Sequence, residues 1–131
     1  TSLFFLRNLP VDIQLATRKA IAEIENIEPN IVICCGMAEK RSRLTIESQA
    51  WCEDNCLSTA IDLPKLKQSL VNTEISHDAG KFVCEGLYYQ LLKYIQLHGK
   101  NLDCIFIHVP KLETNNSTQI LEDFRRVLAW F

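Results

Sequence analysis

Short apolar runs alternate along this chain with longer segments in which apolar residues recur every three or four positions. Three of the runs are typical of strands, at Leu3–Leu6, Ile31–Cys35 and Cys104–Val109. The second and third are almost continuously apolar, which is typical of strands buried on both faces of a parallel sheet. We therefore expect both of them to be buried within one mainly parallel sheet.

Helical periodicity fills the segments between and after these runs. Apolar residues keep helical spacing from Ile13 to about Ile27, and Asp12 is placed to cap that helix. The clearest helix spans Lys81 to His98, and Gly99 follows it where a left-handed C-terminal cap belongs. A last helix is predicted to begin at one of the polar residues 116–118.

The middle of the chain has a less regular pattern. Residues 37–50 are mixed and polar, so we expect a loop or an irregular strand there. Residues 54–64 are rich in turn formers, and the stretch from 52 to 63 is the favoured place for a mobile or shortened loop. A short helix is predicted at Leu63–Leu70 and a short strand at Glu74–Ser76.

Strands that alternate with helices predict an α/β fold, because parallel strands are joined by right-handed helical crossovers. We expect a three-layer α/β/α sandwich with a mainly parallel sheet and helices on both faces. The length of 131 residues favours a single domain, 1–131, with a core large enough to need no disulfide or metal. The first residue is Thr1 and not Met, which is typical of a processed chain or a fragment.

Charge and hydropathy exclude several classes of partner. The net charge of −2 lacks the basic excess of a nucleic-acid-binding surface. No apolar run approaches the ~20 residues that a membrane helix needs. The run at Leu3–Leu6 is broken by Arg7 and is too short for a signal peptide, so a cytoplasmic protein is predicted.

Six cysteines are fewer than a disulfide scaffold needs, and without a secretion signal we expect all of them to be reduced. The unbroken apolar context predicts that three of them are buried inside strands, at positions 34, 35 and 104. A zinc site is disfavoured, because the adjacent thiols at 34 and 35 point to opposite faces of a strand. The six are Cys34, Cys35, Cys52, Cys56, Cys84 and Cys104.

Three residues are candidates for chemistry. Cys84 lies in the first turn of a predicted helix, where free N–H groups favour a thiolate and could stabilise an oxyanion. His108 lies at the carboxyl end of a predicted strand, where ligands bind in parallel sheets, and could act as a base toward a thiol. Glu47 could orient a histidine. The alternatives are a buried core thiol, a locally hydrogen-bonded histidine and a solvated carboxylate. The charged run 39–43 is more typical of a solvated loop than of a binding patch.

Taken together, these residues resemble the pyrrolidone-carboxylate peptidases, also called pyroglutamyl-peptidase I, a family of cysteine peptidases. The most specific segment is Ser76–Tyr89, with its Ser, Ala-Gly, aromatic-Val-Cys, Leu and paired aromatic residues. Phe106–Pro110 resembles the family's Phe-Ile-His-hydrophobic-Pro motif. The strand that ends at Gly36, followed by Ala38, Arg41, Thr45 and Glu47, resembles the segment that carries the family's acidic residue.

The resemblance implies an enzyme of phosphorylase/hydrolase-like fold that removes an N-terminal pyroglutamyl residue from peptides. Cys84 would be the nucleophile, His108 the base and Glu47 the residue that orients His108. No metal or organic cofactor is implied, and the family is cytoplasmic and often forms homo-oligomers. The implied partner is a peptide with N-terminal pyroglutamate; no nucleic acid or membrane is implied.

The chain departs from the family pattern around the substrate pocket. The family's N-terminal strand and Phe-x-Pro-Phe-Gly loop have no counterpart, and Met37 stands where the family has a glutamine that binds the reacting carbonyl. The segment between Glu47 and Cys84 is also shorter than in the family. A divergent, non-catalytic relative that serves as a binding or assembly module is therefore the alternative hypothesis.

Overall fold

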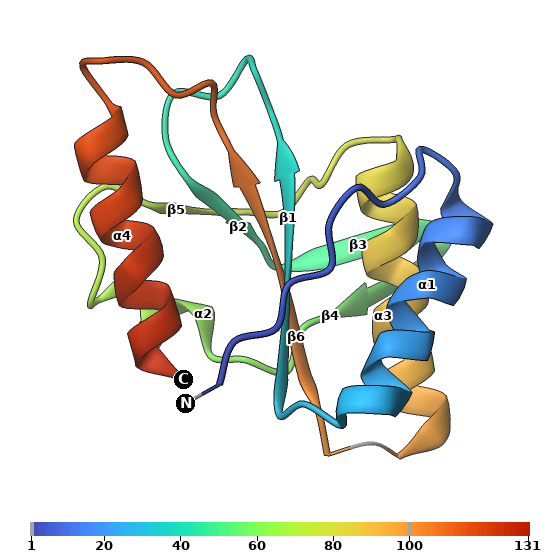
Figure 1. The fold of residues 1–131 in the computed structure, drawn as a ribbon. Coiled ribbons are helices and arrows are strands. Elements are labelled where there is room, and N and C mark those ends of the chain that lie inside the picture. Colours follow the sequence, from blue (N-terminus) through green and yellow to red (C-terminus); the bar gives the residue numbers. More distant parts are fainter. Residues whose placement is uncertain (1, 100) are drawn as a thin grey trace.

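A computed structural model describes residues 2–99 and 101–131, and Figure 1 shows their arrangement. The described residues form a sheet between two layers of helices, together with a small separate hairpin. The helices are α1 (Ile13–Ile27), α2 (Leu63–Lys67), α3 (Val83–His98) and α4 (Ser117–Trp130). The strands are β1 (Ile31–Met37), β2 (Thr45–Glu47), β3 (Gln49–Cys52), β4 (Asn55–Ser58), β5 (Glu74–Ser76) and β6 (Asp103–Val109).

The main sheet has the strand order β1-β6-β2-β5. The two long strands, β1 and β6, are parallel over seven residue pairs, and the short β2 and β5 are parallel to each other. Strand β2 runs antiparallel to β6, so the sheet is mixed and not uniformly parallel. The α/β class and the predicted strands at 31–35, 74–76 and 104–109 are confirmed.

Alternation along β6 divides the core into two halves. Phe106 faces the layer of α1 and α3, where it packs in one cluster with Tyr88. Ile105 and Ile107 face the other side and pack in a second cluster with Val127 of α4. Because successive side chains of a strand point to opposite faces, one strand holds both helical layers to the sheet. Figure 1 shows α4 on one side of the sheet and α1 with α3 on the other, as the sandwich prediction requires.

The helix ends follow the local chemistry of the sequence. Asp12 caps α1 by accepting a hydrogen bond from the backbone N–H of Leu15 at 2.9 Å, and Glu28 ends the helix in the left-handed region, at a φ of 53°. Gly99 ends α3 in the same region, at a φ of 55°, as predicted. Helix α4 begins after Asn116, but the side chain of Asn116 makes no capping hydrogen bond.

Several expectations are corrected by the structure. Leu3–Leu6 forms no strand; its side chains are largely exposed and no neighbouring strand pairs with it. The run at Ile31–Cys35 is a strand, but β1 is at the edge of the sheet, so it is only partly buried and Cys35 is exposed. Of the three cysteines predicted to be buried, Cys104 is buried and Cys34 is half-buried. All six cysteines are free thiols.

The region predicted to be a loop contains a second correction. Strands β3 and β4 form an antiparallel hairpin, whose turn has Glu53 in the left-handed region at a φ of 55°. Ala50 and Leu57 of the hairpin pack on the α1 and α3 side of the core. The sequence missed β4 because its four residues alternate too briefly to stand out from a turn-rich segment.

Candidate active site

The three candidate residues come from three neighbouring elements. His108 is the sixth residue of β6, where it lies opposite Gly36 of β1 on one side and Thr45 of β2 on the other. Glu47 ends β2, and Cys84 is the second residue of α3. The fold therefore brings together residues that are 61 positions apart in the case of Glu47 and His108.

Glu47 and His108 form a buried pair. The Oε1 atom of Glu47 lies 2.9 Å from Nδ1 of His108, and the two side chains are 0% and 6% exposed. A carboxylate at this atom makes Nδ1 the protonated nitrogen and leaves Nε2 free to face a reacting group. The interpretation of Glu47 as a solvated loop carboxylate is wrong, because the residue ends a fully buried strand.

The imidazole is basic in this setting. Burial alone lowers the pKa of His108, but interaction with the Cys84 thiol and with the Glu47 carboxylate outweighs it and raises the pKa to about 9. A histidine between an acid and a thiol is the electrostatic arrangement that favours an imidazolium beside a thiolate. The thiol contacts the ring closely enough to contribute to this rise in pKa. Such contacts often tighten only when substrate binds.

Cys84 lies in a close-packed position at the start of α3. A Cβ atom at Gly36 would lie 2.8 Å from its Sγ and 3.1 Å from the ring of Phe106, so the thiol packs directly over the glycine backbone. The residue before the helix, Phe82, provides no side-chain cap. The first N–H groups of a helix have no helical acceptor, so those of α3 are available to a negatively charged oxygen near Cys84.

An apolar groove of about 560 Å³ opens at Cys84. One wall comes from the segment that leads into α1, with Leu9 and Val11, and another from the start of α3, with Phe82. Phe106 of β6 also lines it. This N-terminal wall stands beside the nucleophile candidate.

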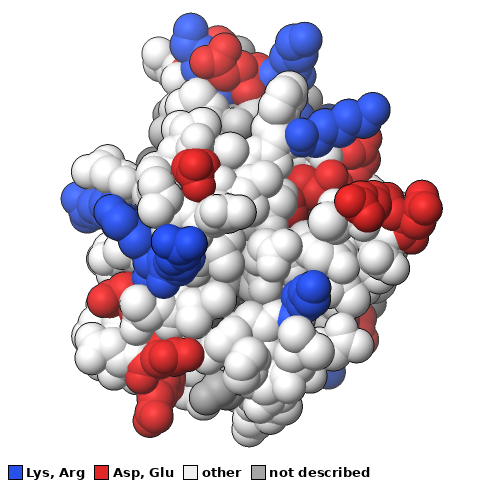
Figure 2. Space-filling model, turned by 90° about the vertical axis from the view of Figure 1, so that its right-hand side faces the viewer, with Lys and Arg blue, Asp and Glu red and all other residues white. Residues whose placement is uncertain are grey.

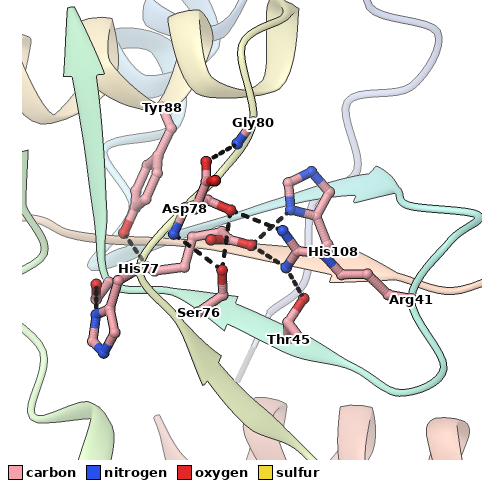
Figure 3. A network of polar contacts seen from close by, with 10 residues as sticks. Arg41, Thr45, Ser76, His77, Asp78, Gly80, Tyr88 and His108 are labelled. Carbon is pink, nitrogen blue, oxygen red and sulfur yellow. Dashed lines mark hydrogen bonds and ion pairs between the residues drawn. The ribbon is translucent and has the colours of Figure 1, made fainter.

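Sequence reasoning named Arg41 and Thr45 only as motif residues and assigned no role to the polar shell around Glu47. Arg41 donates to Oε1 of Glu47 and to Thr45 Oγ1, each at 2.5 Å, and to the carbonyl of Asp78 at 2.8 Å. Tyr88 donates from its hydroxyl to the backbone carbonyl of Glu47 at 2.9 Å. Figure 3 shows these residues converging from the segment after β1, from β2, from the segment before α3 and from α3 itself. The run 39–43 lies in a loop, as the prediction favoured, but within it Arg41 pairs with Glu47. Its place six residues before a candidate acid was the available signal.

Other kinds of site find less support in the structure. Among the described residues, no group of three or more His, Cys, Asp and Glu side chains could hold a metal ion, and no helix is long and apolar enough to cross a membrane. Figure 2 shows the side of the molecule that carries α1 and α3, with acidic and basic groups both scattered over it. That face has no field of a single sign that would attract a polyanion.

Comparison with known proteins gives matches to pyroglutamyl peptidases. Residues 60–123 match the sequence model of the pyroglutamyl peptidase family, a segment that includes Cys84 and His108 but not Glu47. A pyrrolidone-carboxylate peptidase of Thermoanaerobacter sp. (strain X514) is 28% identical over 130 residues, and one of Brachyspira hyodysenteriae is 30% identical over 128 residues. The matches cover 79% and 78% of this chain but only 64% of each relative, which is less than two thirds.

Solved structures agree with the fold. A pyrrolidone carboxyl peptidase variant from Pyrococcus furiosus superimposes with a TM-score of 0.80 at 20% identity, covering 92% of this chain and 77% of the other. Pyroglutamyl peptidase I from Bacillus amyloliquefaciens gives a TM-score of 0.78 at 20% identity, covering 92% and 72%. At 20% sequence identity, these two matches show similarity of fold alone. Together, the matches in sequence and in fold support the pyroglutamyl peptidase family as the family of this chain.

Proposed function

We propose that this chain is a cysteine peptidase that removes an N-terminal pyroglutamyl residue from peptides, with Cys84, His108 and Glu47 as its catalytic triad. The observation that carries the proposal is the buried contact of 2.9 Å between Glu47 Oε1 and His108 Nδ1, next to a thiol at a helix N-terminus. A structural thiol would need no basic imidazole beside it, and a structural histidine would need no buried carboxylate.

The chemistry follows from the positions of the three side chains. His108 takes the proton of the Cys84 thiol at Nε2, and the sulfur attacks the pyroglutamyl carbonyl to form a tetrahedral intermediate. The N–H groups at the start of α3 receive the negative oxygen. His108 then gives the proton to the leaving amine as the C–N bond breaks, and a water molecule hydrolyses the thioester by the same sequence. Glu47 holds the ring in orientation and balances the charge of the imidazolium.

The substrate would enter the apolar groove at Cys84. The pyroglutamyl ring is a small lactam without charge, which suits a groove lined by Leu9, Val11 and Phe82. No cofactor takes part in this reaction. A cytoplasmic location and assembly into homo-oligomers, both implied by the family resemblance, complete the proposal.

Hydrolysis of a pyroglutamyl chromogenic amide tests the proposed function. We expect turnover by the native chain, loss of turnover in Cys84→Ser and undiminished turnover in Cys35→Ser, because Cys35 is an exposed thiol on β1 outside the triad. Titration of the thiols with iodoacetamide should likewise single out Cys84 as the thiol that reacts first. A folded chain that binds pyroglutamyl peptides without hydrolysing them would favour the binding-module alternative.

A further inference from the structure

The guanidinium of Arg41 joins the candidate acid to the segment that leads into the nucleophile helix. Arg41 follows β1, in the segment that leads to β2, and its side chain is 28% exposed beside the fully buried Glu47. Its Nη1 atom donates to Glu47 Oε1 and to Thr45 Oγ1, while Nη2 donates to the carbonyl of Asp78. One side of the guanidinium therefore contacts the acid, and the other contacts the segment that leads into α3.

That segment is held in a defined shape by short-range hydrogen bonds. Ser76 Oγ donates to the carbonyl of Asp78 at 3.1 Å and accepts from the backbone N–H of Asp78 at 3.2 Å. The side chain of Asp78 accepts from the backbone N–H of Gly80 at 2.9 Å, where the backbone turns with a φ of 93°. Cys84 follows four residues later. A displacement of the Asp78 carbonyl would be transmitted along this short turn to the start of α3.

Glu47 is also shared between two cations. Oε1 accepts from both Arg41 and His108, whereas Oε2 is buried and has no hydrogen-bond partner. The two donors therefore share one oxygen of the acid. Two positive groups that contact one oxygen lie close enough to repel each other, so Arg41 opposes the charge on the imidazolium.

We propose that Arg41 is a positioning residue for this site: its guanidinium fork fixes Glu47 relative to the Asp78 turn and limits how tightly Glu47 holds the His108 proton. The proposal rests on the proposed function for its catalytic consequence, but not for its effect on the ring. Lysine can supply the charge but not two diverging N–H groups in a fixed plane, so the two parts of the role are separable.

Two variants whose side chains are similar in length to arginine separate the effect of its charge from the effect of its geometry. Arg41→Lys keeps the positive charge and gives up the fork, and Arg41→Met gives up both. We measure the pKa of His108 by NMR titration of its ring, the alkylation rate of Cys84 by iodoacetamide, and kcat and KM on a pyroglutamyl amide. Circular dichroism and the thermal unfolding midpoint show whether each variant is folded.

In Arg41→Met, the pKa of His108 is expected to rise above its native value of about 9, because the positive charge that opposes the imidazolium is gone. In Arg41→Lys, that pKa stays near the native value, while kcat falls about tenfold or more because the turn before α3 is no longer fixed to the acid. KM should change less than kcat, since Arg41 does not line the groove.

The outcomes distinguish this proposal from the proposed function. Native kcat in Arg41→Lys would overturn the role of the fork, and an unchanged pKa of His108 in folded Arg41→Met would overturn the role of the charge. If the native chain does not hydrolyse the amide, the proposed function fails, but the ring titration and the alkylation of Cys84 still measure both roles. A slower alkylation in Arg41→Lys then supports the fork, and an unchanged rate refutes it.

Discussion

Replacing Gly36 by alanine perturbs the candidate nucleophile without changing any group that takes part in the chemistry. The new methyl would lie 2.8 Å from Cys84 Sγ and 3.1 Å from two ring carbons of Phe106. Relaxed contacts between such heavy atoms are roughly 3.5–4.0 Å, so the sulfur has to withdraw by about 0.7–1.2 Å. Misplacement of about 1 Å costs a reaction about 100-fold in rate.

The same overpacking destabilises the fold by about 1–3 kcal/mol, which a domain of this size can bear. We therefore expect folded Gly36→Ala with hydrolysis of the pyroglutamyl amide reduced about 100-fold. Urea titration followed by circular dichroism measures the stability. Val32→Ile is the matched control, because it adds a methylene on the same face of β1, four residues before Gly36, in the core cluster that Cys84 also packs against.

Gly36→Ala that loses the stated stability but keeps native turnover would show that the sulfur is free to move, and that its position over β1 is irrelevant to the chemistry. Loss of turnover in Val32→Ile to the same extent would show that turnover follows the general packing of the core. Either result refutes the reasoning from the 2.8 Å approach.

Three further predictions concern single side chains. Cys84 should react with iodoacetamide faster than the other five thiols, and His108→Ala should slow that reaction at neutral pH; mass spectrometry of each alkylated peptide tests both. Glu47→Gln should lower the pKa of His108 from about 9, because the carboxylate is one of the groups that raise it. A raised histidine pKa stabilises the fold fully below the unfolded-state pKa of about 6.5, and this stabilisation is lost as the pH rises toward 9. The free energy of unfolding should therefore fall more steeply over that range in the native chain than in Glu47→Gln. Asp123→Ala should cost about 3 kcal/mol in urea titrations, because the buried carboxylate accepts hydrogen bonds from residues 71–73. Burial raises the pKa of Asp123 but those hydrogen bonds lower it overall, so the difference between native and variant should be constant above about pH 5 and shrink in acid.

Most of the helices and strands were predicted correctly from local signals in the sequence. The helices at α1 and α3 and the strands β1, β5 and β6 were predictable, because periodicity, capping residues and continuous apolar runs are properties of neighbouring residues. Burial was less predictable, since the partial exposure of β1 depends on its place at the edge of the sheet. The hairpin of β3 and β4 was missed because its stability comes from packing against α3, which is distant in sequence.

The candidate site was predictable only in part. The positions of Cys84 and His108, at a helix start and a strand end, carry a chemical expectation of their own, and the family resemblance strengthens it. Glu47 has no such local signal: it becomes distinct only when β2 pairs with β6 and its carboxylate reaches the imidazole. Arg41 was hidden for a related reason, because its partners lie on β2 and before α3, and a charged run shows nothing about tertiary contacts.

The division of the core by the sheet gives each helical layer its own optical reporter. The chain has two tryptophans, and they lie in different parts of the fold. Trp51 belongs to the hairpin that packs beside α3, whereas Trp130 is at the end of α4 and packs against the cluster on the other face. Phenylalanine at either position leaves a chain whose fluorescence follows one layer alone. Unfolding curves from the two single-tryptophan chains would coincide if β6 couples the layers into one cooperative unit, and would separate if the layer with the candidate site melts independently.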